Sequence, residues 1–93
     1  MRESRIELRV CAYAKSKGML VFKCTGHKGI PDRIFHYSGR SFYIEFKAPG
    51  KKPREIQKRV IQKILDQNIA VHLVDNVEDG VAVVNSILRG DGC

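Results

Sequence analysis

Two carboxylates and one amine in the middle of the chain have residue types and a spacing that suit metal-assisted hydrolysis. Asp32 follows a proline, which holds the backbone extended at this point. Glu45 and Lys47 lie two positions apart in an apolar run, so a strand would place both side chains on one face. Ile44 and Phe46 would then point into the core from the opposite face. Carboxylate oxygens bind Mg²⁺ or Mn²⁺, the metal activates a water, and a fixed ammonium group orients that water or binds phosphate, a combination that predicts phosphodiester hydrolysis.

The segments around these residues are expected to form a β-hairpin. Two runs rich in Ile, Phe and Tyr, Arg33–Tyr37 and Phe42–Lys47, flank a Ser-Gly-Arg segment at 38–40 that is typical of a turn. The hairpin would fold Asp32, at the start of its first strand, back beside Glu45 on the second. Taken singly, an Asp after a Pro is typical of a turn, and Glu-x-Lys is typical of an exposed ion pair. Only their combination points to a catalytic site.

Hydrophobic periodicity predicts helices and a strand on either side of the hairpin. Apolar residues at helical spacing, followed by a glycine, indicate a first helix over Glu3–Lys17, and Met19–Lys23 is expected to be a strand. A loop rich in Pro, Gly and Lys precedes a second, amphipathic helix. The apolar positions of this second helix are Ile56, Val60, Ile61, Ile64 and Leu65.

The C-terminal third of the chain completes an α/β pattern. Ala70–Val74 is a β-branched strand, and Asn76 is a predicted N-cap for a third helix. The apolar positions of the third helix are Val77, Val81, Val84 and Leu88. The order αβββαβα predicts a single α/β domain over residues 1–93, with a mixed sheet flanked by helices. The second helix would be the crossover that joins the last two strands in parallel.

The charge balance favours a polyanionic partner. Seventeen Lys and Arg against ten Asp and Glu give a net charge of +7. No apolar run approaches the ~20 residues that span a bilayer, and the charged N-terminus does not resemble a secretory signal, so a nucleic acid, DNA or RNA, is expected and a membrane is not. The side chains expected to bind DNA phosphates are Lys28, Lys51, Lys52, Arg54, Lys58 and Arg59. A solvated basic helix face is the alternative interpretation.

The cysteines indicate a reducing compartment. Cys11, Cys24 and Cys93 are odd in number, widely spaced and without a C-x-x-C pair, which speaks against a zinc ribbon or a disulfide scaffold. We expect reduced thiols in a cytoplasmic protein. The segment Arg89–Cys93 is expected to be a frayed end without a function.

The motifs in their order resemble the PD-(D/E)XK nuclease signature. Gly29-Ile-Pro-Asp32 is followed by Tyr43-Ile-Glu45-Phe-Lys47 and then by Gln57 at the start of a helix. Among the branches of that superfamily the chain most resembles the virus-type replication–repair nuclease (VRR-NUC) family, in its stand-alone phage or bacterial form. The resemblance covers nearly the whole chain and implies the restriction-endonuclease-like core that the predicted element order also suggests.

This resemblance implies a role for each matched residue. Asp32, Glu45 and the backbone carbonyl of Phe46 would bind Mg²⁺ or Mn²⁺, Lys47 would assist the attacking water, and Gln57 would position water or phosphate. The family pattern also has a carboxylate on the first helix. Glu3 and Glu7 both remain candidates for it, with Glu3 preferred as a further metal ligand.

The expected function is a metal-dependent, structure-selective DNA endonuclease. No segment resembles a base-reading element, and the resemblance suggests a Holliday-junction resolvase. Resolution needs two matched nicks, so one small chain with one site would act as a homodimer. The alternatives are a flap, nick or single-strand nuclease, a non-catalytic basic DNA-binding module, and a structural protein of a larger assembly. No small-molecule substrate is expected, and a phage or prophage protein acting in the host cytoplasm would fit.

Overall fold

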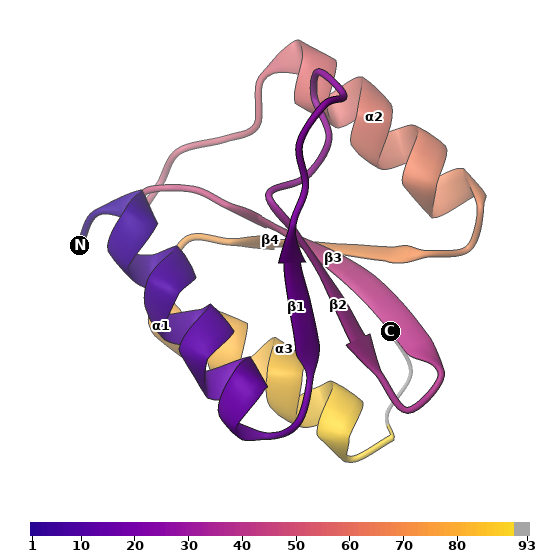
Figure 1. Cartoon of the computed structure of the whole chain (residues 1–93). Coiled ribbons are helices and arrows are strands. Elements are labelled where there is room, and N and C mark those ends of the chain that lie inside the picture. Colours follow the sequence, from indigo (N-terminus) through magenta and orange to yellow (C-terminus); the bar gives the residue numbers. More distant parts are fainter. Residues whose placement is uncertain (91–93) are drawn as a thin grey trace.

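The computed structural model describes residues 1–90, and its elements follow the predicted order. They are α1 (Glu3–Ser16), β1 (Leu20–Lys23), β2 (Arg33–Tyr37), β3 (Arg40–Phe46), α2 (Glu55–Asp66), β4 (Ala70–Val74) and α3 (Val77–Leu88) (Figure 1). The predicted αβββαβα order is thus confirmed. Residues 91–93, which include Cys93 and most of the expected frayed end, lie outside the described part of the chain.

The four strands form one mixed sheet in the order β1-β2-β3-β4. β1 pairs with β2 and β2 with β3 in antiparallel fashion, and the β2–β3 register runs from Arg33 opposite Ile44 to Tyr37 opposite Arg40. β3 pairs with β4 in parallel, with Phe46 beside Val74. A parallel neighbour requires a crossover, and α2 provides it, as the amphipathic pattern predicted.

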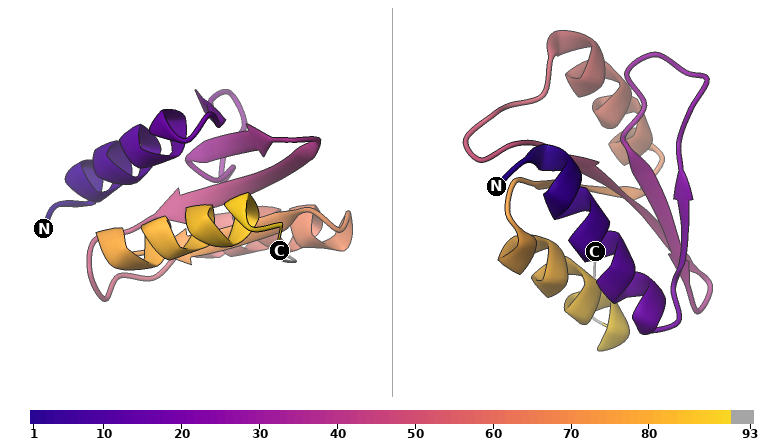
Figure 2. Two further views of the ribbon diagram at one scale, coloured as in Figure 1. Left: turned by 90° about the horizontal axis from the view of Figure 1, so that it is seen from below. Right: turned by 60° about the vertical axis from the view of Figure 1, so that its left-hand side comes forward.

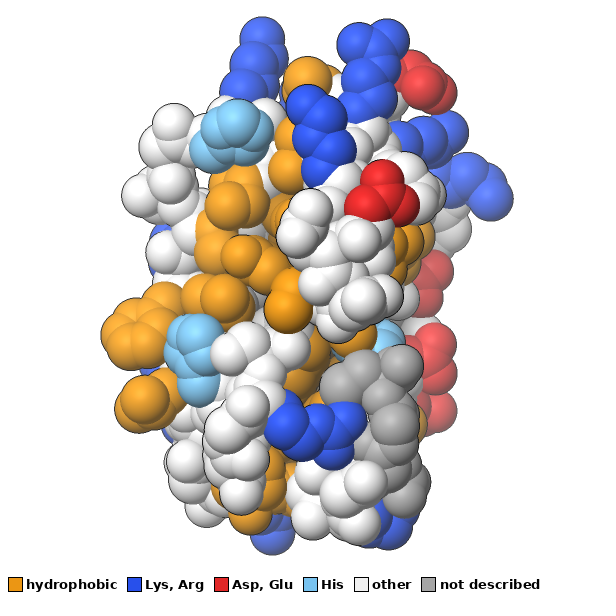
Figure 3. All heavy atoms as spheres, turned by 90° about the vertical axis from the view of Figure 1, so that its right-hand side faces the viewer, with side chains coloured by type: hydrophobic (Ala, Val, Ile, Leu, Met, Phe, Trp, Pro, Cys, Tyr) orange, Lys and Arg blue, Asp and Glu red, His pale blue; other side chains and the backbone are white. Residues whose placement is uncertain are grey.

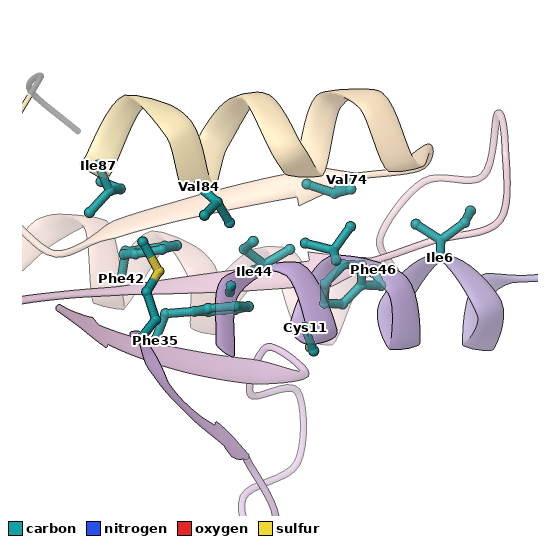
Figure 4. Packing of buried hydrophobic residues seen from close by; sticks show 12 residues of the cluster. Ile6, Cys11, Phe35, Phe42, Ile44, Phe46, Val74, Val84 and Ile87 are labelled. Carbon is teal, nitrogen blue, oxygen red and sulfur yellow. The ribbon is translucent and has the colours of Figure 1, made fainter. Parts of the chain in front are cut away.

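The core lies between one face of the sheet and the pair α1 and α3. Figures 1 and 2 show these two helices side by side, with α2 apart from them. Phe35, Phe42, Ile44 and Phe46 project from alternate positions of β2 and β3 and are completely buried. Figure 4 shows them meeting side chains from both helices. This packing holds the β2–β3 hairpin as a rigid base for its polar opposite face.

The hairpin turn is tighter than expected. β2 ends at Tyr37 and β3 begins at Arg40, so the turn consists of Ser38 and Gly39 alone. Both turn residues have positive φ, 49° and 79°, as a type I′ turn requires. Because Arg40 belongs to the strand, β3 starts two residues earlier than predicted and ends at Phe46 instead of Lys47. The first helix and first strand are each one residue shorter than expected.

The buried stripe of α3 differs from the prediction at three of its four positions. Gly80, Val84 and Ile87 are buried, whereas Val77, Val81 and Leu88 are only half-buried. The reason is the close approach of α1: a Cβ on Gly80 would lie 2.4 Å from Val10 Cγ2. Glycine is not counted among the apolar residues of a helical pattern, although here Gly80 lies in the contact between α1 and α3.

The opposite face of the sheet is only partly covered. α2 packs on β4 and buries Val60, while Ile56, Ile61 and Ile64 stay half-buried and Leu65 is exposed. Leu73 on β4 remains 54% exposed. Within residues 1–90, no helix combines the length and the apolar character that crossing a membrane requires.

Candidate active site

Asp32 and Glu45 meet where β2 begins and β3 ends. The β2–β3 register stops at Arg33 opposite Ile44, and Asp32 closes the hairpin just beyond it. The backbone N–H of Asp32 donates to Glu45 Oε1 at 3.2 Å. Asp32 Oδ2 in turn accepts the backbone N–H of Phe46 at 2.8 Å. The hairpin therefore brings the two carboxylates together, as the sequence predicted.

Glu45 is a buried carboxylate held by two further side chains. It is 1% exposed, and its Oε2 accepts from Lys47 Nζ at 3.1 Å and from Gln57 Nε2 at 2.7 Å. Gln57 is itself buried, and its Oε1 accepts the backbone N–H of Arg54 at 2.9 Å. The start of α2 thereby fixes the Gln57 amide, which fixes Glu45. Asp32, Glu45, Lys47 and Gln57 form one connected group, the carboxylate cluster.

The environment of this cluster disfavours two negative charges. Burial raises the pKa of Glu45, and the neighbouring Asp32 raises it further, against the opposing effect of Lys47. Burial likewise raises the pKa of Asp32, opposed first by the hydrogen bond from the Phe46 N–H. The carboxylates of Glu7 and Glu3 add to this increase. A cation placed between the carboxylates would relieve both effects.

The donor set fits a divalent cation with hard-oxygen preference. Asp32 and Glu45 supply two carboxylates, and within residues 1–90 no hydrogen bond is made to Asp32 Oδ1. The described residues include no group of three His, Cys, Asp or Glu side chains able to hold a metal. Mg²⁺ binds typically through one or two carboxylates and keeps several waters, so this pair of carboxylates suits such an ion.

The two candidate carboxylates of α1 differ in their contacts. Glu7 Oε2 accepts from Arg33 Nε at 2.6 Å in a half-buried ion pair. Glu3 is half-buried in the first turn of the helix, and of the two it has the smaller effect on Asp32. Both lie within electrostatic reach of the cluster, and the Arg33 pair makes Glu7 the less available ligand.

Sequence reasoning did not single out Arg33. It pairs with Ile44, whose side chain is in the core beneath α1 and α3, so strand alternation directs Arg33 toward α1 as well. That alternation was visible in the sequence, but the position of α1 over this face of the sheet was not. Arg33 also shares a surface hollow with three other basic residues, Arg2, Arg5 and Lys23.

The predicted DNA-binding side chains separate into two basic hollows beside α2. One hollow, here called the lysine hollow, lies between α2, the end of β4 and the segment 47–53, and its cations are Lys47, Lys51, Lys52 and Lys58. The other lies between α2 and the segment before Asp32, with the basic side chains His27, Lys28, Arg59 and Lys63. Arg54 is exposed at the start of the helix. Figure 3 shows Lys and Arg side chains gathered over the α2 end of the molecule, above an area of hydrophobic side chains.

Glycine is required where the polypeptide approaches α2 ahead of Asp32. Gly29 has a φ of 87°, and a Cβ there would lie 2.8 Å from the backbone oxygen of Ile56. Both the backbone conformation and the space exclude a side chain. Gly29 therefore sets how closely the Asp32 segment packs against the helix that carries Gln57.

Comparisons with known proteins agree with this architecture. No family model matches the chain. It is 34% identical over 62 residues to "Putative nuclease p44" of Acyrthosiphon pisum secondary endosymbiont phage 1, an alignment that covers 63% of this chain and 67% of the phage protein. A solved structure described as "VRR_NUC domain" superposes with a TM-score of 0.81 at 22% identity, and the match covers 89% of this chain and 94% of that one. The predicted fold is thereby confirmed.

Proposed function

This chain belongs to the virus-type replication–repair nuclease (VRR-NUC) family, and we propose that it is a Mg²⁺- or Mn²⁺-dependent endonuclease that hydrolyses DNA phosphodiesters. The observation that carries the proposal is the carboxylate cluster. Asp32 and Glu45 are brought together at the end of a rigid hairpin, and Glu45 is held by Lys47 and Gln57. Burial raises the pKa values of these two adjacent carboxylates. A divalent cation bound between them would stabilise their ionised forms.

Each residue of the cluster has a role that follows from its contacts. Asp32 and Glu45 would hold the metal, with the Phe46 carbonyl as a third ligand and Glu3 or Glu7 acting on it from α1. When bound, the ion would lower the pKa of a coordinated water and neutralise charge on the phosphate. Lys47 would turn from Glu45 toward the attacking water or a phosphate oxygen. Gln57 would keep Glu45 in one orientation, because a ligand fixed by an outer hydrogen bond loses less freedom on binding.

The distribution of charge supports a DNA substrate recognised through its phosphates. Basic side chains flank the carboxylate cluster on the α2 side, where Lys28, Lys51, Lys52, Arg54, Lys58 and Arg59 lie, and on the α1 side around Arg33. Contacts of this kind bind DNA without reading its sequence. We therefore propose selectivity for DNA structure over sequence.

A four-way junction is the substrate we place first. Its resolution needs two symmetric cuts, and a second copy of the chain would supply the second carboxylate cluster. The protein would then act as a homodimer in the cytoplasm of its host, where Cys11 and Cys24 would stay the free thiols that the structure records. Flaps, nicks and single strands are the alternative substrates, with a monomer as the active form.

Cleavage of labelled DNA tests the proposal. Wild type and Asp32→Ala would be compared on four-way junction, flap, duplex and single strand, with Mg²⁺, Mn²⁺ or chelator. Asp66→Ala is the matched control, because Asp66 is an exposed acid at the end of α2 that bonds only to Gln62 in the hydrogen bonds described. We expect metal-dependent cutting that Asp32→Ala abolishes and Asp66→Ala retains.

The pattern of products separates the candidates. Paired nicks at a junction, together with a dimer in sedimentation, support the resolvase. Cutting of flaps or single strands alone retains the nuclease and removes the resolvase. DNA binding without any metal-dependent cutting would leave a basic binding module with a nuclease fold.

A further inference from the structure

The lysine hollow has an apolar floor as well as a charged rim. Its volume is about 570 Å³, within the range of roughly 300–1,000 Å³ typical of ligand sites. The apolar side chains that form this floor are those of Pro53, Ile61 and Leu73. Leu73 is 54% exposed, so a substantial apolar surface faces solvent at the base of a cationic hollow. Lys47 belongs both to this hollow and to the carboxylate cluster, which places the two sites side by side.

The rim holds cations with little internal compensation. In the described part of the chain, no carboxylate forms an ion pair with Lys51 or Lys52, and Lys58 makes one exposed contact, with Glu55 at 3.3 Å. The lining also contains one acid, Asp75, whose carboxylate accepts from the Gly50 backbone N–H at 3.1 Å and from Asn76 Nδ2 at 2.9 Å and keeps its negative charge. With four lysines against this one carboxylate in the lining, the charge balance of the hollow is positive and favours an anion.

The position of the rim is fixed by the backbone. The Lys47 N–H donates to the Val74 carbonyl at 2.9 Å, which continues the parallel pairing beyond β3, and Lys51 closes a turn onto the Ala48 carbonyl. With the Gly50–Asp75 bond, these contacts attach the segment 47–53 to the end of β4. Backbone hydrogen bonds of the fold therefore hold the walls of the hollow in place.

We propose that the lysine hollow binds one unpaired nucleotide of the DNA strand next to the phosphodiester held at the carboxylate cluster. This proposal rests on the proposed function. Within a duplex the bases stay stacked, so a protein meets phosphates, sugars and base edges but no base face that could cover an apolar floor. An unpaired base can leave the stack and lie against apolar side chains, while the lysines hold its phosphates. Flaps, single strands and frayed ends supply such a nucleotide and a continuous duplex does not. In a four-way junction, whose arms are base-paired, a pair at the branch point would have to open to supply it.

Binding of a minimal ligand tests the hollow without any cleavage. Isotope-labelled protein in chelator would be titrated by NMR with thymidine 3′,5′-bisphosphate, with the same sugar bisphosphate lacking the base, and with inorganic phosphate. We expect amide shifts around Lys51, Lys52 and Leu73, and binding of the nucleotide at least about three-fold tighter than of the base-free compound. Equal affinity for both compounds, or shifts gathered around Lys28 and Arg59, would overturn the proposal.

Two variants separate rim from floor. Lys52→Ala should weaken the nucleotide and the base-free compound alike, by roughly two- to five-fold, whereas Lys63→Ala in the other hollow should not. Leu73→Ser should remove only the advantage of the nucleotide, and its matched control is Leu65→Ser, an exposed leucine outside the hollow. Loss of the advantage in Leu65→Ser and not in Leu73→Ser would contradict the inference.

Failure of this inference differs from failure of the proposed function. If the protein cuts DNA with metal but shows no preference for the nucleotide, the nucleotide site is rejected and the nuclease function is retained. If the nucleotide binds at the hollow but the protein cuts no DNA, the nucleotide site is retained and the nuclease function is rejected.

Discussion

The side-chain amide of Gln57 donates to Glu45 Oε2 over 2.7 Å, and this bond connects the first turn of α2 to the buried end of β3. The same oxygen accepts from Lys47 Nζ. Gln57 thus lies behind the carboxylate, whereas the family resemblance suggested water or phosphate as its partner. Its position points to a part in orienting Glu45.

Removal of that amide should weaken metal use more than folding. Gln57→Ala leaves Glu45 Oε2 with one donor, and loss of such an outer hydrogen bond typically costs about 10–100-fold in metal affinity or activity. We expect the Mn²⁺ concentration for half-maximal cleavage to rise by a factor in that range. Gln67→Ala is the control, since Gln67 is an exposed glutamine at the C-terminal end of the same helix. An unchanged metal requirement in Gln57→Ala would contradict the role.

Neutralising Asp32 should stabilise the metal-free protein. Its pKa is raised in the fold, so the ionised group costs stability near neutral pH, and this cost disappears as the pH falls through the folded pKa. Asp32→Asn keeps an oxygen that can accept the Phe46 N–H and removes the charge. A gain on the order of 0.5–1 kcal/mol would raise the Tm by roughly 2–8 °C in a domain of this size.

Thermal unfolding with and without Mn²⁺ checks this prediction. The wild-type Tm should rise when the metal is added, because a ligand that binds only the folded state stabilises it. The Asp32→Asn variant should start higher and gain little. A variant that is less stable than wild type in chelator would show that the negative charge of Asp32 contributes to folding by itself.

Stability should fall on mild acidification because of His72. This residue lies on β4 with its ring in a T-shaped contact with Phe42. Its Nε2 is buried without a partner in the described part of the chain, and burial lowers its pKa below 6.5. The unfolded chain therefore binds a proton before the folded one does, and stability declines as the pH falls through about 6.5 toward the folded pKa. His72→Leu should remove this decline and add roughly 1 kcal/mol at neutral pH.

Urea unfolding at pH 7.5 and 5.5 measures the difference. His27→Ala is the control, as His27 is exposed. The raised pKa of Asp32 acts in the opposite direction on acidification, so the quantity to compare is wild type minus His72→Leu at each pH. An identical pH dependence in the two proteins would assign the acid sensitivity to other groups.

The α1–α3 contact should not tolerate alanine at Gly80. In an exposed helix Gly→Ala gains about 1 kcal/mol, but here the added Cβ would lie 2.4 Å from Val10 Cγ2 and 3.2 Å from Val74 Cγ1. Overpacking of this kind costs typically 1–3 kcal/mol, so a net loss of stability is expected. In a double-mutant cycle, Val10→Ala should cost less in the Gly80→Ala background than in wild type. Additive losses in urea unfolding would argue against direct contact.

The pattern of residues predicted the hairpin and the carboxylate pair because both depend on local information. Alternation on β3 assigns Glu45 and Lys47 to one face, and a two-residue turn sets the register that returns Asp32 to Glu45. The side of the sheet that a helix covers, and its depth, depend on packing between distant segments. For that reason the burial of Gln57 against Glu45 and the Arg33–Glu7 pair were not predicted.

For a similar reason, the apolar floor of the lysine hollow and the buried positions of α3 were not predicted. Its lysines were expected to bind phosphates, but the apolar floor needs Leu73 of β4 beside Ile61 of α2, a juxtaposition that only the crossover creates. In α3 the observed stripe differs from the predicted one because Gly80, which lies against Val10 of α1, carries no hydrophobic signal.

The turn at Ser38 and Gly39 lies at the opposite end of the hairpin from Asp32. The seven residues of β3 separate the two ends by roughly 20 Å at about 3.4 Å per residue. Apart from Gly39 itself and its two chain neighbours, no heavy atom among residues 1–90 lies within 4 Å of where a Cβ on Gly39 would be. Extra chain can therefore be grafted into this turn, as exposed loop tips allow, so a fluorescent tag or a whole targeting module inserted there would extend away from the chemistry. The turn at Ser38 and Gly39 is therefore the position in this fold where a fused module would disturb the carboxylate cluster least.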